Sequence, residues 1–389
     1  MKKLVFAIGF IFLFLIFGVT PPANAVFAST QEFSVQAKAS YLIDYNSGKV
    51  LYQNNETKKL PVASIVKLMT ILLTLENVQQ EKLSLTDIVT ASSKASSMGG
   101  SQVFIEEGGT YTIGDLLKSV IVSSANDASL VLAESIAGSE EAFVGLMNDK
   151  AKQLGLDSTV YANCTGLPAP EQFSCAKDIA VLLKEVTSHD IYHNYSTIWI
   201  DKLEHKNNRK TELVNTNKLI RYYKGCDGGK TGSTNEAGYC LAATAKRGDM
   251  RLIAVVLGAE NGKERFKQTS DLLNYGFNNF ENKKIINKAN KIENSIRVVG
   301  GKSDKVELVP KQDMYLLTKK IDKGGSVTTR VELPEILKAP LKAGQSVGKL
   351  YLMQDDQVVG CEDIVVSKDI LPSTITDNIL DIISNWAII

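Results

Sequence analysis

Apolar positions along the chain alternate in some segments, as in strands, and recur every three or four residues in others, as in helices. Two short apolar runs, Ala39–Tyr45 and Lys49–Gln53, flank the turn residues Asn46-Ser47-Gly48, which predicts a β-hairpin. From Ser64 onward the spacing becomes helical, and Ser64 lies where an N-cap residue belongs. The same periodicity predicts three further helices, over Ile113–Ser123, Ala128–Ala137 and Glu140–Leu154.

Strand patterns return in the second half of the chain. The apolar runs Tyr239–Ala245 and Arg251–Leu257 are joined by a polar turn and predict two more strands. A helix is expected after them, over Glu264–Phe280. The chain up to this point is therefore expected to have a helical middle inserted between strands that begin and end the unit.

The remainder of the chain has a different pattern. Residues Asn282–Lys291 are rich in Asn and Lys and are expected to form a linker. Only short alternating runs separated by glycine turns follow, which predicts a small all-β domain. These runs are Ser295–Val299, Lys305–Val309, Met314–Thr318, Ser326–Leu333 and Lys349–Met353.

The N-terminus has the pattern of a secretory signal peptide. Lys2 and Lys3 precede the apolar run Leu4–Val19, and Ala23-Asn24-Ala25 supplies small residues for cleavage near Ala25 or Ala28. A transmembrane anchor is the alternative, but the run of about 16 residues is shorter than the ~20 that a spanning helix needs. We therefore expect an exported protein.

The C-terminus has an amphipathic pattern. In Ser373–Ile389, six apolar residues including Trp386 fall on one helical face, and Asp377 and Asp381 fall on the other. This pattern predicts a helix that anchors the chain on a membrane surface, with Trp at the interface. The alternative is a terminal helix that packs on the protein itself or on a partner.

Composition narrows the class of protein. The 389 residues are 44% apolar and 22% charged, which is typical of a globular chain and excludes disorder and multiple membrane spans. The 44 Lys and Arg balance 43 Asp and Glu, so nothing favours nucleic acid as a partner. Five cysteines, an odd number spread over about half the chain, do not indicate a disulfide scaffold. Cys226 and Cys240 are candidates to face each other across a hairpin, and burial as small apolar side chains is the alternative for most of the five.

Three short motifs are typical of serine acyl-transfer chemistry. Ser64-Ile65-Val66-Lys67 places a hydroxyl and an amine one helical turn apart, where a neutral lysine can act as the base for a serine nucleophile. Ser124-Ala125-Asn126 follows about 60 residues later, between two predicted helices, and Lys230-Thr231-Gly232 about 105 residues after that, at the expected start of a strand. Each motif alone is weak, because Ser174-Cys175-Ala176-Lys177 and Ser233-Thr234-Asn235 match the first two patterns as well.

Order and spacing together make the motifs specific, since this triple is found in penicillin-binding proteins and class A β-lactamases. The sequence resembles the serine D-alanyl-D-alanine carboxypeptidases, the low-molecular-weight penicillin-binding proteins. The resemblance is strong over residues 31–280 and weaker beyond, and it extends past the motifs. Further matching stretches are Ala39–Asp44, Pro61–Thr70, Ser124–Ala128, Thr165–Pro168, Asp227–Gly232 and Ala237–Cys240.

The resemblance implies a mechanism and roles for individual residues. Ser64 would attack the carbonyl between two terminal D-alanines, and Lys67 would take its proton. Ser124 would relay a proton to the leaving amine, and Asn126 would hold Lys67 and the substrate amide. The remaining residues would bind the substrate: Lys230, Thr231 and Arg265 at the terminal carboxylate, Gly232 in the motif, and the backbone N–H groups of Ser64 and Ser233 at the oxyanion.

The same resemblance implies an α/β (α+β) fold of the penicillin-binding and β-lactamase-like transpeptidase type, an antiparallel sheet with a helical subdomain, followed by a small all-β domain. We expect a signal peptide over 1–28, a catalytic domain over 29–281, a β-rich domain over 282–371 and a terminal helix over 372–389. The implied partners are peptidoglycan stems ending in D-Ala-D-Ala, β-lactams as covalent inhibitors, and the membrane surface through the terminal helix. No metal, cofactor or nucleic acid is expected.

Other functions fit parts of the sequence. His189 and His193 have the spacing of zinc-binding histidines, with His205 as a third candidate, but the acid that follows His189 is Asp190 instead of Glu. A class A-like β-lactamase or a peptidoglycan endopeptidase would use the same three motifs. The chain has no Glu-x-x-Leu-Asn stretch where a deacylating glutamate is expected, which favours the carboxypeptidase. A non-catalytic wall-binding module would need no nucleophile.

Overall fold

The structure is a computed structural model that describes residues 33–293, 296–322, 325–374 and 376. The predicted signal peptide lies outside the described residues, and so does nearly all of the predicted terminal helix. Within the described part of the chain, no helix combines the length and apolar character needed to cross a membrane.

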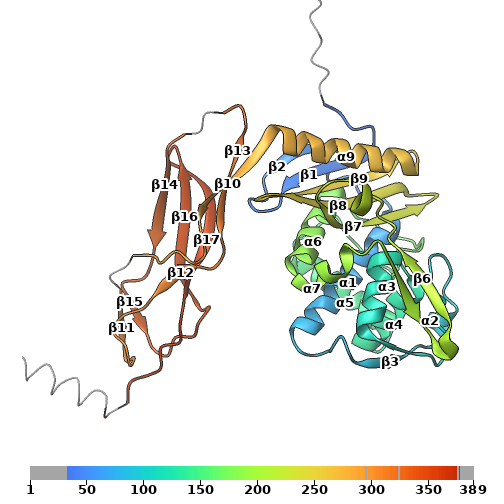
Figure 1. Ribbon diagram of the computed structural model, residues 1–389, viewed down its shortest axis with the longest axis horizontal. Helices are drawn as coiled ribbons and strands as arrows, with labels where there is room; N and C mark the ends of the chain where they lie inside the picture. Colours follow the sequence, from blue (N-terminus) through green and yellow to red (C-terminus); the bar gives the residue numbers. More distant parts are fainter. Residues whose placement is uncertain (1–32, 294–295, 323–324, 375, 377–389) are drawn as a thin grey trace, which may run out of the picture. The chain divides into compact units, whose positions relative to one another are not determined.

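A five-stranded antiparallel sheet organises the first part of the chain, in the order β2-β1-β9-β8-β7 (Figure 1). Both predicted strand pairs, β1 with β2 and β8 with β9, are confirmed. The sheet brings the beginning of the unit next to its end, because β1 pairs with β9. The strands are β1 (Ala39–Asp44), β2 (Val50–Asn54), β7 (Cys226–Thr234), β8 (Gly238–Arg247) and β9 (Met250–Ala259).

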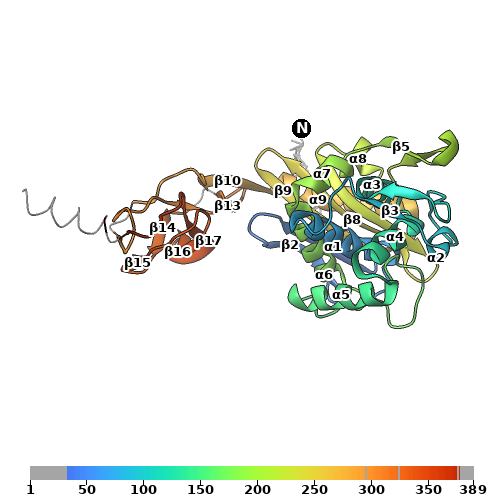
Figure 2. The same cartoon turned by 90° about the horizontal axis from the view of Figure 1, so that it is seen from below.

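Helices cover both faces of this sheet. α9 packs on one face against β8 and β9. α6 packs on the other face, and α1 packs against α6. Figure 2 views the helical side, with α1, α4 and α5 in front of the strands. The helices are α1 (Lys67–Gln79), α2 (Ser93–Ser96), α3 (Ile113–Ser123), α4 (Asn126–Ala137), α5 (Glu140–Gln153), α6 (Ala176–Ser188), α7 (Asp190–Ser196), α8 (Leu219–Tyr222) and α9 (Gly262–Asn279).

Short elements complete this part of the chain. Two small two-stranded antiparallel sheets flank the helices: β3 (Ile88–Thr90) with β4 (Thr110–Thr112), and β5 (Ile200–Glu204) with β6 (Lys210–Val214). The 3₁₀ turns are η1 (Ala63–Val66) and η2 (Lys206–Asn208). One continuous apolar core runs through the helices and the inner face of the sheet, from Ala39 to Leu257.

The chain from residue 280 on forms strands and no helix between 280 and 374 within the described ranges, which confirms the predicted all-β character. One expectation is wrong: the stretch from Asn282 does not begin as a linker, because Phe280–Ile286 forms β10 and pairs with β13. A separate apolar cluster, from Val298 to Ile370, lies among these strands. The other strands are β11 (Arg297–Val299), β12 (Leu308–Pro310), β13 (Met314–Lys319), β14 (Val327–Glu332), β15 (Ile336–Lys338), β16 (Ser346–Gln354) and β17 (Gln357–Val366).

Candidate active site

The turn that carries the predicted nucleophile is η1, which runs directly into α1 at Lys67. The sequence predicts Ser64 as the N-cap of α1, but this is wrong, because Val66 occupies the N-cap position. Instead, Lys67 Nζ donates a hydrogen bond of 3.0 Å to Ser64 Oγ. The tight turn holds a hydroxyl and an amine together, as a serine nucleophile and its base require.

The Lys67 amine is wholly buried at the start of α1. It donates a second hydrogen bond, of 2.6 Å, to the carbonyl oxygen of Thr165. Burial lowers the pKa of Lys67 from 10.5 to about 7, and the nearby Cys164 and Asp127 side chains oppose that shift. A lysine with this pKa is partly neutral at neutral pH, so its amine can accept a proton from Ser64.

The second serine of the motifs lies in the turn between α3 and α4. Ser124 has a left-handed backbone, with φ of 62° and ψ of 33°, which is uncommon for a residue with a side chain and recurs at functional sites. Its hydroxyl accepts a hydrogen bond of 2.6 Å from Lys230 Nζ. The serine of the second motif is therefore paired with the lysine of the third.

Asn126 begins α4 and faces a neighbouring segment. Its Nδ2 donates to the carbonyl of Gly99 at 2.7 Å, and its backbone N–H donates to the carbonyl of Ser101 at 2.7 Å. The hydrogen bond expected between Asn126 and Lys67 is not formed: Asn126 Nδ2 donates to Gly99, and the Lys67 amine donates to Ser64 and Thr165. Asn126 Oδ1 is buried without a hydrogen-bond partner among the described residues, which leaves an acceptor for substrate.

Asp127, which was not among the predicted site residues, stabilises the segment that follows Gly99 and Ser101. Asp127 is 1% exposed, and its carboxylate accepts the backbone N–H groups of Val103 and Ile105 at 3.0 and 3.1 Å. These partners lie 24 and 22 residues earlier in the chain. The only sequence signal is the position of Asp127 directly after Asn126.

The Lys-Thr-Gly motif lies in the middle of β7, not at its start as predicted. β7 is an edge strand of the five-stranded sheet, so one side of its backbone is free of strand partners within the described residues. A Cβ atom at Gly232 would lie 2.6 Å from the carbonyl oxygen of Val62 and 3.0 Å from the backbone N of Ser64. Glycine is therefore needed where the strand passes the nucleophile turn.

Lys230 is the second buried amine of the site, with 1% of its surface exposed. Burial lowers its pKa well below 10.5, and the positive charges of Lys67 and Arg265 act in the same direction. Thr231 beside it is 6% exposed, whereas Ser233 is exposed. An anionic ligand beside Lys230 would raise the pKa of this lysine again and favour its charged form.

Arg265 approaches the same strand from α9. Its Nη1 donates to the carbonyl oxygens of Gly232 and Cys240 at 3.3 and 3.5 Å, and its guanidinium lies over the rings of Tyr239 and Phe266. Arg265 Nε is buried without a hydrogen-bond partner among the described residues. The structure thus brings Arg265 to the Lys-Thr-Gly strand, as predicted, with its buried Nε still able to donate.

The loop after α5 closes over the nucleophile from the other side. Gly166 has φ of +82°, and a Cβ there would collide with the Ala63 carbonyl and lie 2.9 Å from the backbone N of Ser64. A small cavity of about 80 Å³ opens beside this contact. It is lined by Pro61, Val62, Ala63, Gly166, Leu167, Pro168, Ala169, Gln172, Thr234 and Glu236.

The competing matches do not assemble comparable sites. Ser174 is buried and its hydroxyl contacts Thr159 Oγ1 at 2.8 Å, while Lys177 is exposed. His193 Nε2 contacts the Thr187 carbonyl, and the two ring nitrogens of His205 contact hydroxyls. In the part of the chain that the structure describes, no group of three or more His, Cys, Asp or Glu residues is arranged to hold a metal ion.

The cysteines do not pair. Cys226 lies opposite Ala245 in the β7–β8 register and Cys240 lies opposite Gly232, so the proposed facing of the two cysteines is wrong. All five are free thiols; four are buried and Cys361 is exposed.

Comparison with known proteins supports the resemblance over nearly the whole chain. The profile of the D-alanyl-D-alanine carboxypeptidase family matches residues 25–261, and that of the penicillin-binding protein 5 C-terminal domain matches residues 280–371. The chain is 38% identical over 369 residues to the D-alanyl-D-alanine carboxypeptidase DacF of Bacillus subtilis strain 168, covering 95% of each chain. It is 37% identical over 382 residues to DacC of Escherichia coli strain K12, covering 94% of this chain and 91% of the relative.

Solved structures agree with the fold. Penicillin-binding protein 5 from Haemophilus influenzae superposes with a TM-score of 0.69 at 32% identity, covering 91% of this chain and 100% of that one. Penicillin-binding protein D2 from Listeria monocytogenes in its ampicillin-bound form gives 0.56 at 31% identity, covering 63% of this chain and 99% of that one. The predicted fold class is confirmed.

Proposed function

The chain belongs to the D-alanyl-D-alanine carboxypeptidase family of penicillin-binding serine peptidases, and on this premise we propose that Ser64 is its nucleophile. One observation carries the proposal: the Lys67 amine lies 3.0 Å from Ser64 Oγ and has a pKa lowered to about 7. A serine becomes a strong nucleophile when a neutral base is in hydrogen-bond contact with it. The decoy serine, Ser174, has no such neighbour among the contacts of its hydroxyl.

The reaction proceeds in two steps. Ser64 Oγ attacks the carbonyl carbon between the two terminal D-alanines, and its proton moves to Lys67. The C–N bond then breaks, and a proton passes to the leaving amine through Ser124, whose hydroxyl is already in contact with Lys230. Free D-alanine departs and leaves an ester on Ser64. Water adds to this ester in the second step, which releases the shortened stem and restores the Ser64 hydroxyl.

The substrate carboxylate binds at the Lys-Thr-Gly strand. Lys230 and Thr231 supply a cation and a hydroxyl donor, and Arg265 reaches the same strand from α9. Because burial and two neighbouring cations lower the pKa of Lys230, an anionic ligand is what makes its charged form favourable. The site therefore discriminates in favour of a peptide with a free C-terminus.

The carbonyl oxygen is stabilised by the backbone N–H groups of Ser64 and Ser233. Removing one such donor typically costs roughly 3 kcal/mol of transition-state stabilisation. Gly232 permits this arrangement, because any side chain there would meet the backbone N of Ser64. The free edge of β7 lets an extended peptide lie alongside the strand, with its scissile carbonyl at the nucleophile.

β-Lactams acylate the same serine in this proposal. The ampicillin-bound relative from Listeria supports it, since that protein holds a β-lactam on a similar fold. The acyl-enzyme should persist, whereas a β-lactamase would release it rapidly. An endopeptidase acting on cross-linked stems shares the site but has no support beyond that of the carboxypeptidase.

The finer organisation completes the proposal. Residues 1–28 direct export and are removed, residues 29–281 form the catalytic domain, residues 282–371 form the β-rich domain, and residues 372–389 bind the outer face of the cytoplasmic membrane. The substrates are peptidoglycan stems ending in D-Ala-D-Ala. The export and anchoring segments rest on the sequence patterns given above.

The nucleophile is tested by mass spectrometry of the intact protein after penicillin treatment, with peptide mapping of the adduct. We expect one adduct on the peptide that contains Ser64. Ser64→Ala should abolish both this adduct and the release of D-alanine from a pentapeptide ending in two D-alanines. Ser174→Ala is the matched control and should behave as the natural chain; labelling of Ser64→Ala at the normal rate would refute the assignment.

A further inference from the structure

The second partner of the Lys67 amine is a backbone carbonyl on a loop. Thr165 O accepts a hydrogen bond of 2.6 Å from Lys67 Nζ, shorter than the 3.0 Å bond from the same amine to Ser64 Oγ. A neutral amine has one lone pair and two N–H bonds. An N–H that points at Thr165 fixes the rotation of the amine and leaves the lone pair two directions, so the position of this carbonyl helps to orient the base.

The loop has a local support that fixes its shape. Asn163 Oδ1 accepts the backbone N–H groups of Thr165 and Gly166 at 3.1 and 2.7 Å. These bonds close a tight turn, but they all lie within the loop. They do not determine where the loop sits relative to α1.

Cys164 also attaches the loop to the rest of the molecule. Its carbonyl accepts a hydrogen bond of 2.8 Å from Thr70 Oγ1, one turn after Lys67 on α1. Its backbone N–H and its thiol both contact Glu140 Oε1, at 3.3 and 3.4 Å. The residue directly before Thr165 is thus held on one side by α1 and on the other by Glu140.

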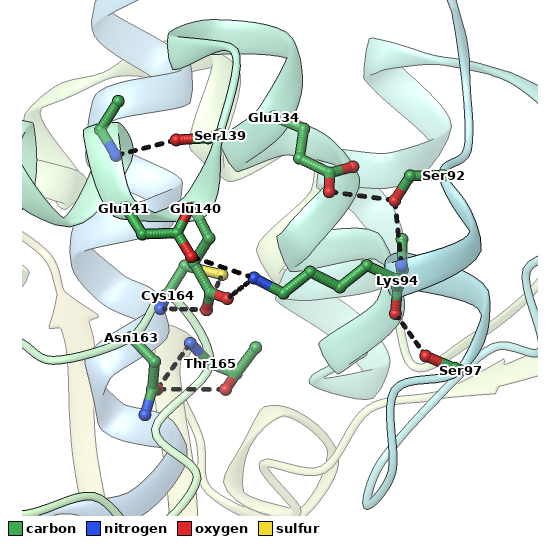
Figure 3. A network of polar contacts seen from close by, with 12 residues as sticks. Ser92, Lys94, Ser97, Glu134, Ser139, Glu140, Glu141, Asn163, Cys164 and Thr165 are labelled. Carbon is green, nitrogen blue, oxygen red and sulfur yellow. Dashed lines mark hydrogen bonds and ion pairs between the residues drawn. The ribbon is translucent and has the colours of Figure 1, made fainter.

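The Glu140 side chain is held in place from two sides, because its two carboxylate oxygens have separate partners. Oε1 contacts Cys164, while Oε2 forms an ion pair of 2.9 Å with Lys94 Nζ. Figure 3 shows Glu140 between Lys94 and Cys164, with Thr165 next along the loop. The Glu140 side chain is 14% exposed, whereas the adjacent Glu141, which also contacts Lys94, is 79% exposed.

We propose that Glu140 is a positioning residue for catalysis, which holds the Cys164–Thr165 loop so that the Thr165 carbonyl orients the Lys67 amine toward Ser64. The inference rests on the proposed role of Lys67 as the base. Glu140 itself touches neither Ser64 nor Lys67 in the contacts that the structure shows. Its effect is therefore expected on the acylation step and not on the affinity for the ligand.

Glu140→Ala removes one of the two supports of Cys164 and lets the loop shift relative to α1. The acylation rate at saturating penicillin should fall about tenfold, because small displacements of a reacting group are costly. Water admitted around the amine should also raise the pKa of Lys67, whose burial is the main cause of its low value. The rise of the acylation rate with pH should thus move to higher pH, while the penicillin concentration for half-maximal rate changes little.

The measurement is the time course of the penicillin adduct on the full chain, by intact-protein mass spectrometry, at several pH values and penicillin concentrations. Glu140→Gln keeps a side-chain oxygen for the Cys164 N–H and should restore most of the rate. Glu141→Ala removes a neighbouring carboxylate that also contacts Lys94 but not the loop, and should leave the rate and pH profile unchanged.

Two results would overturn the proposal. In the first, the Glu140→Ala chain keeps the natural pH profile, and its acylation rate falls only as much as the fraction of chains that can be labelled. This result would indicate partial misfolding alone. The other is a Glu141→Ala chain with an equal defect. Failure of the proposed function is distinguishable, because it would show as absence of a Ser64 adduct in the natural chain.

Discussion

Two lysine amines are buried against two serine hydroxyls, and this arrangement is unfavourable for folding. Lys67 contacts Ser64 and Lys230 contacts Ser124, and burial lowers the pKa of both lysines. Burying an ionisable amine destabilises the folded state, because the group must lose its proton or its hydration. The site therefore gains a base at neutral pH at the expense of stability, a trade-off that is common in enzymes.

Replacing Lys67 with Met should expose this trade-off directly. The folded chain gives up the Lys67 proton near pH 7 and the unfolded chain near pH 10.5, so the unfolded state binds more protons between these values. The free energy of unfolding of the natural chain should therefore rise with pH across this window, and Lys67→Met should remove this rise. The variant should be inactive toward penicillin yet more stable at pH 7, with its advantage shrinking as pH approaches 10.5.

Urea denaturation at several pH values measures this effect. Lys177→Met is a suitable control, since Lys177 is exposed and its substitution should leave the pH dependence of stability unchanged. A Lys67→Met chain that is less stable than the natural one at pH 7 would show that the amine contributes more through its two hydrogen bonds than its burial costs.

Regular elements with strong local signals were predictable, and those formed by distant contacts were not. The β1–β2 hairpin, α3 and α5 follow their apolar periodicity within a residue or two. The period is equally clear in α6, where Ile179, Leu182, Leu183 and Val186 are buried, but its N-cap is Cys175, which is not an ordinary capping residue. That helix was not predicted, although its signal is present in the sequence.

The Lys-Thr-Gly strand shows why part of the site could not be predicted. β7 contains three glycines and two charged residues among nine, a composition that disfavours a strand, so the sequence predicts the motif at the start of a strand and not in its middle. It is a strand because it pairs with β8 on one side and passes the nucleophile turn on the other. The partners of Asn126, the Gly99 and Ser101 carbonyls, were likewise invisible because they lie on a distant segment.

The loop around Gly166 should be as sensitive as a catalytic residue. Gly166→Ala forces a side chain into the left-handed region and into the Ala63 carbonyl, so we expect a stable site to be lost along with acylation of Ser64. Gly138→Ala is a matched control: Gly138 has φ of +80°, against +82° for Gly166, but a Cβ atom there would meet no other atom within 4 Å. It should cost only about 1 kcal/mol of stability and leave acylation intact. Equal effects of the two substitutions in denaturation and penicillin labelling would show that backbone conformation alone, not the close approach, makes Gly166 necessary.

The chemistry of the molecule is concentrated in the part of the chain that ends with α9. Every residue assigned to the site lies between Ser64 and Arg265, and the core that supports these residues runs from Ala39 to Leu257. The apolar cluster from Val298 to Ile370 is formed by strands and the segments between them, and it contributes no residue to the site. The net charge of +1 fits this division, because the cations that matter are placed locally on and beside β7.

This separation predicts that the first core is sufficient for acylation. A chain of residues 29–279 ends with α9 and omits β10, which would otherwise be left without β13, its strand partner. We expect it to fold and to form the Ser64 adduct at a rate within about twofold of that of the full chain, because a domain with its own core folds alone. The same truncation carrying Ser64→Ala is the control for non-specific labelling. An aggregated or unreactive truncated chain would mean that the β-rich part is needed to stabilise the catalytic fold.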